Sequence, residues 1–112
     1  MIQGMHAMFY TDKPEETRAF FRDKLDFPAT DVGDGWLIFD TPEADIGCHP
    51  SDGQHHRVSF YCDDIEETVE TLKSRGVEFT GDIEDEGWGL ATAFKLPDGS
   101  EVQLYEPKYE KS

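Results

Sequence analysis

Basic residues are scarce in this chain of 112 amino acids. Lysine and arginine together number 10, against 25 aspartate and glutamate residues, so the formal net charge is −15. Nucleic acid is bound by clustered basic side chains that displace counterions from phosphates, and anionic membranes attract the same kind of surface. The composition therefore argues against nucleic acid and membrane as partners.

Cysteines and long apolar runs are equally scarce. Cys48 and Cys62 have no CxxC spacing and are too few for a disulfide scaffold, so we expect two buried thiols without a chemical role. No run approaches the roughly 18 apolar residues of a membrane span, and residues 1–10 lack the basic start of a signal peptide. We expect one folded, soluble, cytoplasmic domain with a single core.

Several motifs of catalysis and cofactor binding are missing. The chain contains no GxSxG nucleophile elbow, no GxGxxG turn and no Walker loop. Nothing in the sequence therefore indicates serine-hydrolase, nicotinamide or phosphoryl-transfer chemistry.

An internal repeat is present. Residues 9–17 match residues 60–68 at an offset of 51 with six of nine positions identical, and residues 39–42 match 94–97 at an offset of 55. Two copies of one structural unit with small loop changes explain the slipping offset. We place module one at about 2–50 and module two at about 55–107.

Each copy is predicted to form a strand, a helix and three further strands. Helices are expected to begin at N-cap aspartates, Asp12 in the first copy and Asp63 or Asp64 in the second, and to end near Lys24 and Gly76. Alternation in the strand that opens module two places Val58, Phe60 and Cys62 on one face and Arg57, Ser59 and Tyr61 on the other. The predicted strands are 4–10, 29–32, 36–40, 44–49, 57–62, 77–80, 90–96 and 101–106. The fold class is α+β, with two tandem βαβββ modules whose sheets enclose a cleft.

Five segments carry a resemblance to a known family: His6, Ala19–Leu25, Gly87–Gly89, Leu96–Gly99 and Gln103–Pro107. With the duplication, they make residues 4–107 resemble the vicinal oxygen chelate superfamily of glyoxalases, bleomycin-resistance proteins and extradiol dioxygenases. The resemblance implies a small-molecule cleft and a homodimer.

Metal-dependent members of that superfamily hold a divalent ion with four residues, and the matching positions here are His6, Gly47, Arg57 and Gln103. At the second position the offsets also allow Ile46 or Cys48, but alternation favours Gly47. Glycine has no side chain and arginine is a permanent cation without a lone pair, so we expect a degenerate metal site and no cofactor. A divalent metal stays the alternative, with ligands added by a second chain or by loop histidines. The loop cluster of Cys48, His49, His55 and His56 has no ligand spacing, and we expect solvated histidines there.

The cleft-facing positions give the candidate ligand-binding residues. Arg57, with a planar fork suited to a carboxylate or phosphate, lies beside neutral donors and an aromatic wall. Trp88, between two glycines, is the candidate rim residue. The full set is His6, Tyr10, His49, Arg57, Tyr61, Trp88, Gln103 and Tyr105. Because Asp45 and Glu101 lie only at the rim, we expect a neutral to basic interior without carboxylates.

These features favour a small-molecule-binding protein of the glyoxalase and bleomycin-resistance type, holding a polar or anionic planar organic ligand. The alternative is a metal-dependent lyase, isomerase or dioxygenase of the same superfamily, with His6 as the candidate general acid or base. The residues leave open whether the protein is an enzyme and name no catalytic residue. A ligand-free interaction module is a third hypothesis, drawn from the acidic surface alone.

Overall fold

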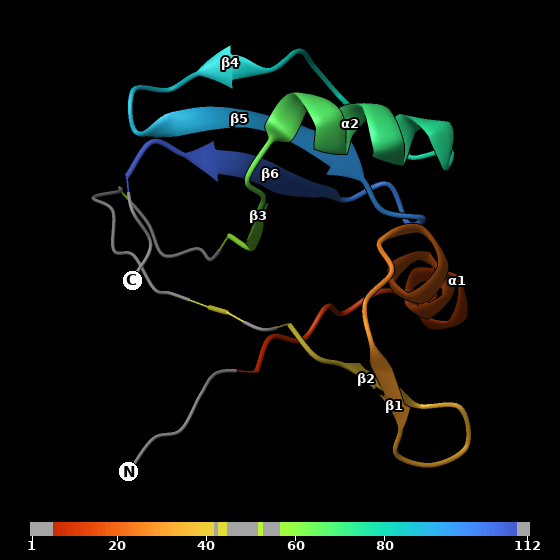
Figure 1. Ribbon diagram of the computed structural model, residues 1–112. Helices are drawn as coiled ribbons and strands as arrows, with labels where there is room; N and C mark the ends of the chain where they lie inside the picture. The colour runs from red at the N-terminus through yellow and green to blue at the C-terminus, as the bar shows by residue number, and fades with distance from the viewer. Residues whose placement is uncertain (1–5, 42, 45–51, 53–56, 110–112) are drawn as a thin grey trace, which may run out of the picture. The chain divides into compact units, whose positions relative to one another are not determined.

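The computed structural model describes residues 6–41, 43–44, 52 and 57–109, and the chain divides into two compact units, 1–56 and 57–112. Its elements, in chain order, are α1 (Pro14–Ala19), the π-helical turn η1 (Phe20–Lys24), β1 (Ala29–Asp31), β2 (Leu37–Phe39), β3 (Ser59–Tyr61), α2 (Ile65–Ser74), β4 (Glu84–Asp85), β5 (Gly89–Lys95) and β6 (Glu101–Pro107) (Figure 1). The predicted α+β class is confirmed. In the described part of the chain, no helix is long and apolar enough to cross a membrane.

An aromatic cluster forms the interior of the first unit. The ring of Phe21 lies 5.4 Å from that of Phe9, 6.0 Å from that of Phe27 and 5.6 Å from that of Phe39. Phe20 and Phe21, which lie within the predicted first helix, are both buried. The β1 and β2 strands lie within the predicted strands 29–32 and 36–40, and they pair antiparallel.

Two predictions for the first unit are wrong. Lys13, not Asp12, is the N-cap of α1, because Pro14 begins the helix and the residue before it takes the cap position. Residues 6–10 form no strand, since a strand needs a hydrogen-bonded neighbour and no described residue pairs with them. The predicted strand at 44–49 lies almost wholly outside the described residues, so a complete first module stays a prediction.

The second unit is a four-stranded sheet with the order β3-β6-β5-β4, in which β3 runs parallel to β6 and the other neighbours are antiparallel. Helix α2 lies along one face of this sheet (Figure 1). Phe94, with only 1% of its surface exposed, stacks with Phe60 at 6.5 Å and meets Phe79 edge-on at 5.7 Å. The buried apolar residues of α2, β5 and β6 are Ile65, Val69, Leu72, Ala91, Phe94, Val102, Leu104 and Tyr105.

The ends of α2 follow from local chemistry. An oxygen of the Asp64 carboxylate accepts a hydrogen bond from the Glu67 backbone N–H at 3.2 Å, which satisfies one of the free donors of the first turn. After the helix, Gly76 adopts a φ of 85°, a conformation that favours glycine. The predicted helix and its end at Gly76 are confirmed.

The edge of this sheet differs from the prediction. Of the predicted strand 77–80, only Phe79 forms a bridge, with Phe94, and the strand β4 comes later. Between the Phe79–Phe94 and Glu84–Ala91 pairs, the edge chain advances five residues while β5 advances three. Residues inserted against a regular neighbour form a bulge, which bends an edge and redirects its side chains.

Replacing Phe94 with alanine tests the core of the second unit. We expect Phe94→Ala to lower the free energy of unfolding by about 3–5 kcal/mol, because a fully buried ring is lost and a cavity is left. Urea titration followed by circular dichroism measures the change. The exposed neighbour Lys95→Ala is the control, expected to cost less than about 1 kcal/mol. Equal losses in the two variants would contradict this assignment of the core.

Candidate functional site

The face of the second unit's sheet that points away from α2, called here the open face, carries the candidate site. Registers between the strands define it: Ser59 pairs with Gln103 and Tyr61 with Tyr105, while β5 places Ala93 opposite Gln103. Directly paired residues project to the same side of a sheet. The predicted grouping of Ser59 and Tyr61 on one face is therefore confirmed.

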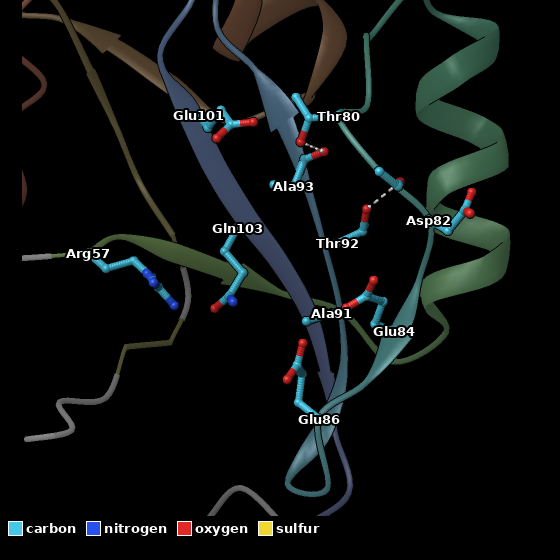
Figure 2. A pocket seen from close by; sticks show the side chains of 11 residues that line it. Arg57, Thr80, Asp82, Glu84, Glu86, Ala91, Thr92, Ala93, Glu101 and Gln103 are labelled. Atoms are coloured by element: carbon cyan, nitrogen blue, oxygen red, sulfur yellow. Dashed lines mark hydrogen bonds between the residues drawn. The ribbon is translucent and has the colours of Figure 1, made fainter.

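A groove of about 410 Å³ lies on the open face. Ala91 and Ala93 line it between taller side chains, so its floor is flat and small. The lining residues are Arg57, Thr80, Gly81, Asp82, Glu84, Glu86, Ala91, Thr92, Ala93, Glu101 and Gln103 (Figure 2). Of the predicted ligand-binding residues, Arg57 and Gln103 are brought together here.

Gln103 is held in place by a hydrogen bond within the sheet. The Ser59 hydroxyl donates to its amide oxygen at 2.7 Å, which leaves the amide N–H groups as donors toward the groove. Figure 2 shows the Arg57 guanidinium directed toward Gln103, and no described residue forms a salt bridge with Arg57. The two side chains offer adjacent donors, suited to a carboxylate or another oxygen acceptor.

Three aromatic residues predicted for the site form a cluster beside the groove rather than part of its lining. The ring of Tyr105 lies 6.2 Å from that of Tyr61 and meets Trp88 edge-on at 5.4 Å. Tyr105 is 8% exposed, whereas Trp88 is 44% exposed. Trp88 is thus packed on one side and open on the other, as a rim residue would be.

The turn that carries Trp88 is fixed by charge and by glycine. The Asp85 carboxylate accepts hydrogen bonds from the Lys108 ammonium at 2.6 Å and from the Gly87 N–H at 2.9 Å. These hydrogen bonds, chiefly the one from Lys108, lower the pKa of Asp85 from its usual value. A Cβ on Gly89 would lie 2.5 Å from the Glu106 carbonyl oxygen, so only glycine allows β5 to approach β6 this closely.

The prediction of a neutral to basic interior missed the carboxylates at the sides of the groove. Glu84 and Glu86 enter the groove from the edge of the sheet, with Asp82 in the bulge and Glu101 at the start of β6. The cause is the position of the edge strand: the sequence predicts it at 77–80, and the predicted elements leave out residues 84–86. The glycine-flanked turn at 87–89 was the available signal, since a hairpin turn before β5 requires a partner strand immediately before it.

The remaining predicted residues lie elsewhere. His6 and Tyr10 belong to the first unit, where both are exposed, Tyr10 to 92%. His49 lies outside the described residues, as do Gly47, Cys48, His55 and His56. The site described here is therefore built from the second unit alone.

The residues at the family's metal positions in the second unit do not fit a divalent ion. Arg57 has no lone pair to donate, and the oxygen of Gln103 already accepts a hydrogen bond from Ser59. The described residues contain no group of three or more His, Cys, Asp or Glu side chains that could hold a metal. The carboxylates of the groove, although several, do not converge into such a group.

Cys62 lies outside the groove. Its thiol is 3.6 Å from the Tyr105 carbonyl oxygen, and partial burial is the main reason that its pKa is raised. A raised pKa keeps a thiol protonated and unreactive at neutral pH, in keeping with the expectation that it has no chemical role.

Comparisons with known proteins agree with the geometry. The model of the Glyoxalase/Bleomycin resistance protein/Dioxygenase superfamily matches residues 5–104. Among curated proteins, an uncharacterized protein of Bacillus subtilis, YetH, is 41% identical over 49 residues, which span 44% of this chain and 41% of that protein.

Solved structures share the fold. TnmS3, an antibiotic binding protein from Streptomyces sp. CB03234, matches with a TM-score of 0.68 and 20% identity over 96% of this chain and all of that one. A superfamily member from Sphaerobacter thermophilus matches with a TM-score of 0.65 and 27% identity, over 94% of this chain and 98% of that one. A lactoylglutathione lyase from Agrobacterium tumefaciens matches with a TM-score of 0.63 and 18% identity, over 88% of each chain.

Substitution of Gly89 tests the packing under Trp88. We expect Gly89→Ala to lower the free energy of unfolding by about 1–3 kcal/mol, because the added methyl group collides with the β6 backbone. The indole N–H resonance of Trp88 should also move in NMR spectra, because Trp88 is the residue next to Gly89. Gly81→Ala is the matched control, because an added Cβ there meets nothing within 4 Å. Indistinguishable stabilities and spectra would contradict the close approach.

Proposed function

Because the chain belongs to the Glyoxalase/Bleomycin resistance protein/Dioxygenase superfamily, we propose that it is a small-molecule-binding protein that holds a polar, planar organic ligand on the open face. One observation carries the proposal: two hydrogen-bond donors, Arg57 and Gln103, stand beside a floor of alanines in a groove of about 410 Å³. That volume is within the range of pockets for small organic ligands.

The shape of the groove supports a flat ligand. Alanine side chains rise little above a sheet, so a ring can lie over the half-buried Ala93, beside Ala91, which is 6% exposed. The cluster of Tyr61, Tyr105 and Trp88 adjoins this floor and supplies further aromatic surface for a ligand that extends beyond the groove. Specificity would come from the donors at the β3 side.

The metal-dependent alternative has less support. A lyase, isomerase or dioxygenase of this superfamily would need a metal at positions where this chain has Arg57 and Gln103. The likeness to a lactoylglutathione lyase, at 18% identity, concerns the fold. We therefore favour ligand binding over metal-assisted turnover.

A thermal-shift screen with planar aromatic compounds that carry carboxylate, hydroxyl or amine groups tests the proposal. A ligand present at 100 times its Kd stabilises a protein by about 2.7 kcal/mol, so we expect the best compounds to raise Tm by several degrees. In NMR titrations of the labelled protein, the same compounds should shift the resonances of Ala91, Ala93 and Gln103.

Two substitutions to leucine, one in the groove and one on α2, sharpen this screen. Ala93→Leu raises the floor of the groove and should abolish the Tm increase, whereas Thr71→Leu, on the exposed side of α2, should leave it intact. Dicarbonyl–thiol adducts and catechols, tested with added divalent metal, should show no turnover. Binding that survives Ala93→Leu, or metal-dependent turnover, would overturn the proposal.

We also propose that two copies of the chain pair, since α2 leaves the open face uncovered within the second unit and the superfamily resemblance implies a dimer. Sedimentation velocity at micromolar concentration should give a mass of about twice the 12.8 kDa of one chain. A single monomeric species across a concentration series would refute the pairing while leaving the ligand proposal in place. Cytoplasmic location stays a prediction from the composition.

A further inference from the structure

We propose that the ligand is dipolar, with a carboxylate that pairs with Arg57 at one side of the groove and a protonated amine that pairs with Glu84 and Glu86 at the other. This inference rests on the proposed function, since it names the class of ligand that the same groove would take. It follows from how the sheet separates charges of opposite sign.

The charges lie at opposite edges of the sheet. Arg57 lies two residues before β3, whereas Glu84 belongs to β4, and β6 and β5 lie between these two strands. Neighbouring strands are about 4.8 Å apart, so three intervals separate the two edge backbones by about 14 Å. The register places Glu84 directly opposite Ala91, on the same face as Tyr105. The carboxylate therefore projects over the floor of the groove.

Within the described part of the chain, no ion pair neutralises these charges. Two nearby lysines are engaged elsewhere: the Lys95 ammonium, at the far end of β5, lies 3.1 Å from a Glu78 oxygen, and the Lys108 ammonium lies 2.6 Å from an Asp85 oxygen. Among the described residues, neither Glu84, Glu86 nor Arg57 takes part in a salt bridge. As far as residues 57–109 are concerned, the groove thus presents a cation without an ion-pair partner on one side and such anions on the other.

The middle of the groove carries no charge. Gln103 and the two alanines separate Arg57 from the carboxylates of the β4 side (Figure 2). A ligand that satisfies both sides must hold its own charges apart by more than one strand spacing. This requirement favours an elongated, flat amino-carboxylate over an α-amino acid, in which a single carbon separates the two groups.

Glu101 also lies near the cationic side and would weaken the attraction of a carboxylate. In Figure 2 the Arg57 side chain is directed toward Gln103, away from Glu101. Removal of the Glu101 charge should therefore strengthen binding of an anion, whereas removal of Glu84 and Glu86 should weaken binding of an amine. The two kinds of carboxylate in the groove are thus distinguishable.

Rigid probes of known charge test the inference. Para-aminomethylbenzoate and its longer biphenyl homologue carry both charges, para-toluate carries only the carboxylate, and para-methylbenzylamine carries only the amine. In NMR titrations at low salt, we expect at least one of the dipolar probes to bind about fivefold more tightly than either singly charged probe. A gain in affinity of this size is what one additional, partly exposed ion pair contributes.

Three variants identify the side chains that bind the carboxylate end and the amine end of the ligand. Glu84→Gln with Glu86→Gln should reduce the affinity for the dipolar probe about three- to fivefold and leave that for para-toluate unchanged or higher, while Arg57→Gln should reduce the affinity for both. Glu101→Gln should raise the affinity for para-toluate. The matched control, Glu66→Gln with Glu70→Gln on α2, makes the same change in net charge and should alter none of these affinities.

The outcomes separate this inference from the proposed function. If para-toluate binds the open face as tightly as both dipolar probes, or if the double glutamine variant binds the dipolar probes normally, the ligand is not dipolar although the groove still binds. If no probe and no compound of the aromatic panel shifts the resonances of Ala91 and Ala93, the proposed function itself fails. A fivefold preference that disappears only in the groove variants supports both.

Discussion

The pairing of β5 with β6 is the constraint on which the rest of the second unit depends. Seven consecutive pairs, from Gly89–Pro107 to Lys95–Glu101, fix which side chains face α2 and which face the open side. A slip of one residue would exchange the two faces and turn Phe94 outward. The contact between Gly89 and the Glu106 backbone pins one end of this register, and the turn between Leu96 and Ser100 closes the other.

Patterns that are local in the sequence predicted much of this unit. Alternation correctly divided the opening strand between two faces, and the cap at Asp64 with the glycine at 76 located the helix. These signals succeed because each depends on residues within one turn or one strand. The same alternation placed Arg57 on the groove side, whereas Gln103 was expected there from the family resemblance.

The edge of the sheet could not be predicted in this way. Whether residues 77–80 or 84–86 pair with β5 depends on a bulge, and a bulge is stabilised by contacts with the neighbouring strand rather than by its own residues. Here the Thr92 hydroxyl donates to the Gly81 carbonyl oxygen at 3.0 Å, which holds the inserted segment against β5. The carboxylates of the groove were missed for this reason, and the ligand class changed once they were placed.

The broken edge also bears on how the protein behaves in concentrated solution. An uninterrupted outer strand offers a row of free N–H and C=O groups on which another chain can add. Here that strand has only two residues, both exposed carboxylic acids, and the bulge precedes it. A second sheet that approached this edge would meet like charge and an irregular backbone. The same distortion that brings Glu84 to the groove therefore protects this edge of the sheet from the addition of a further strand.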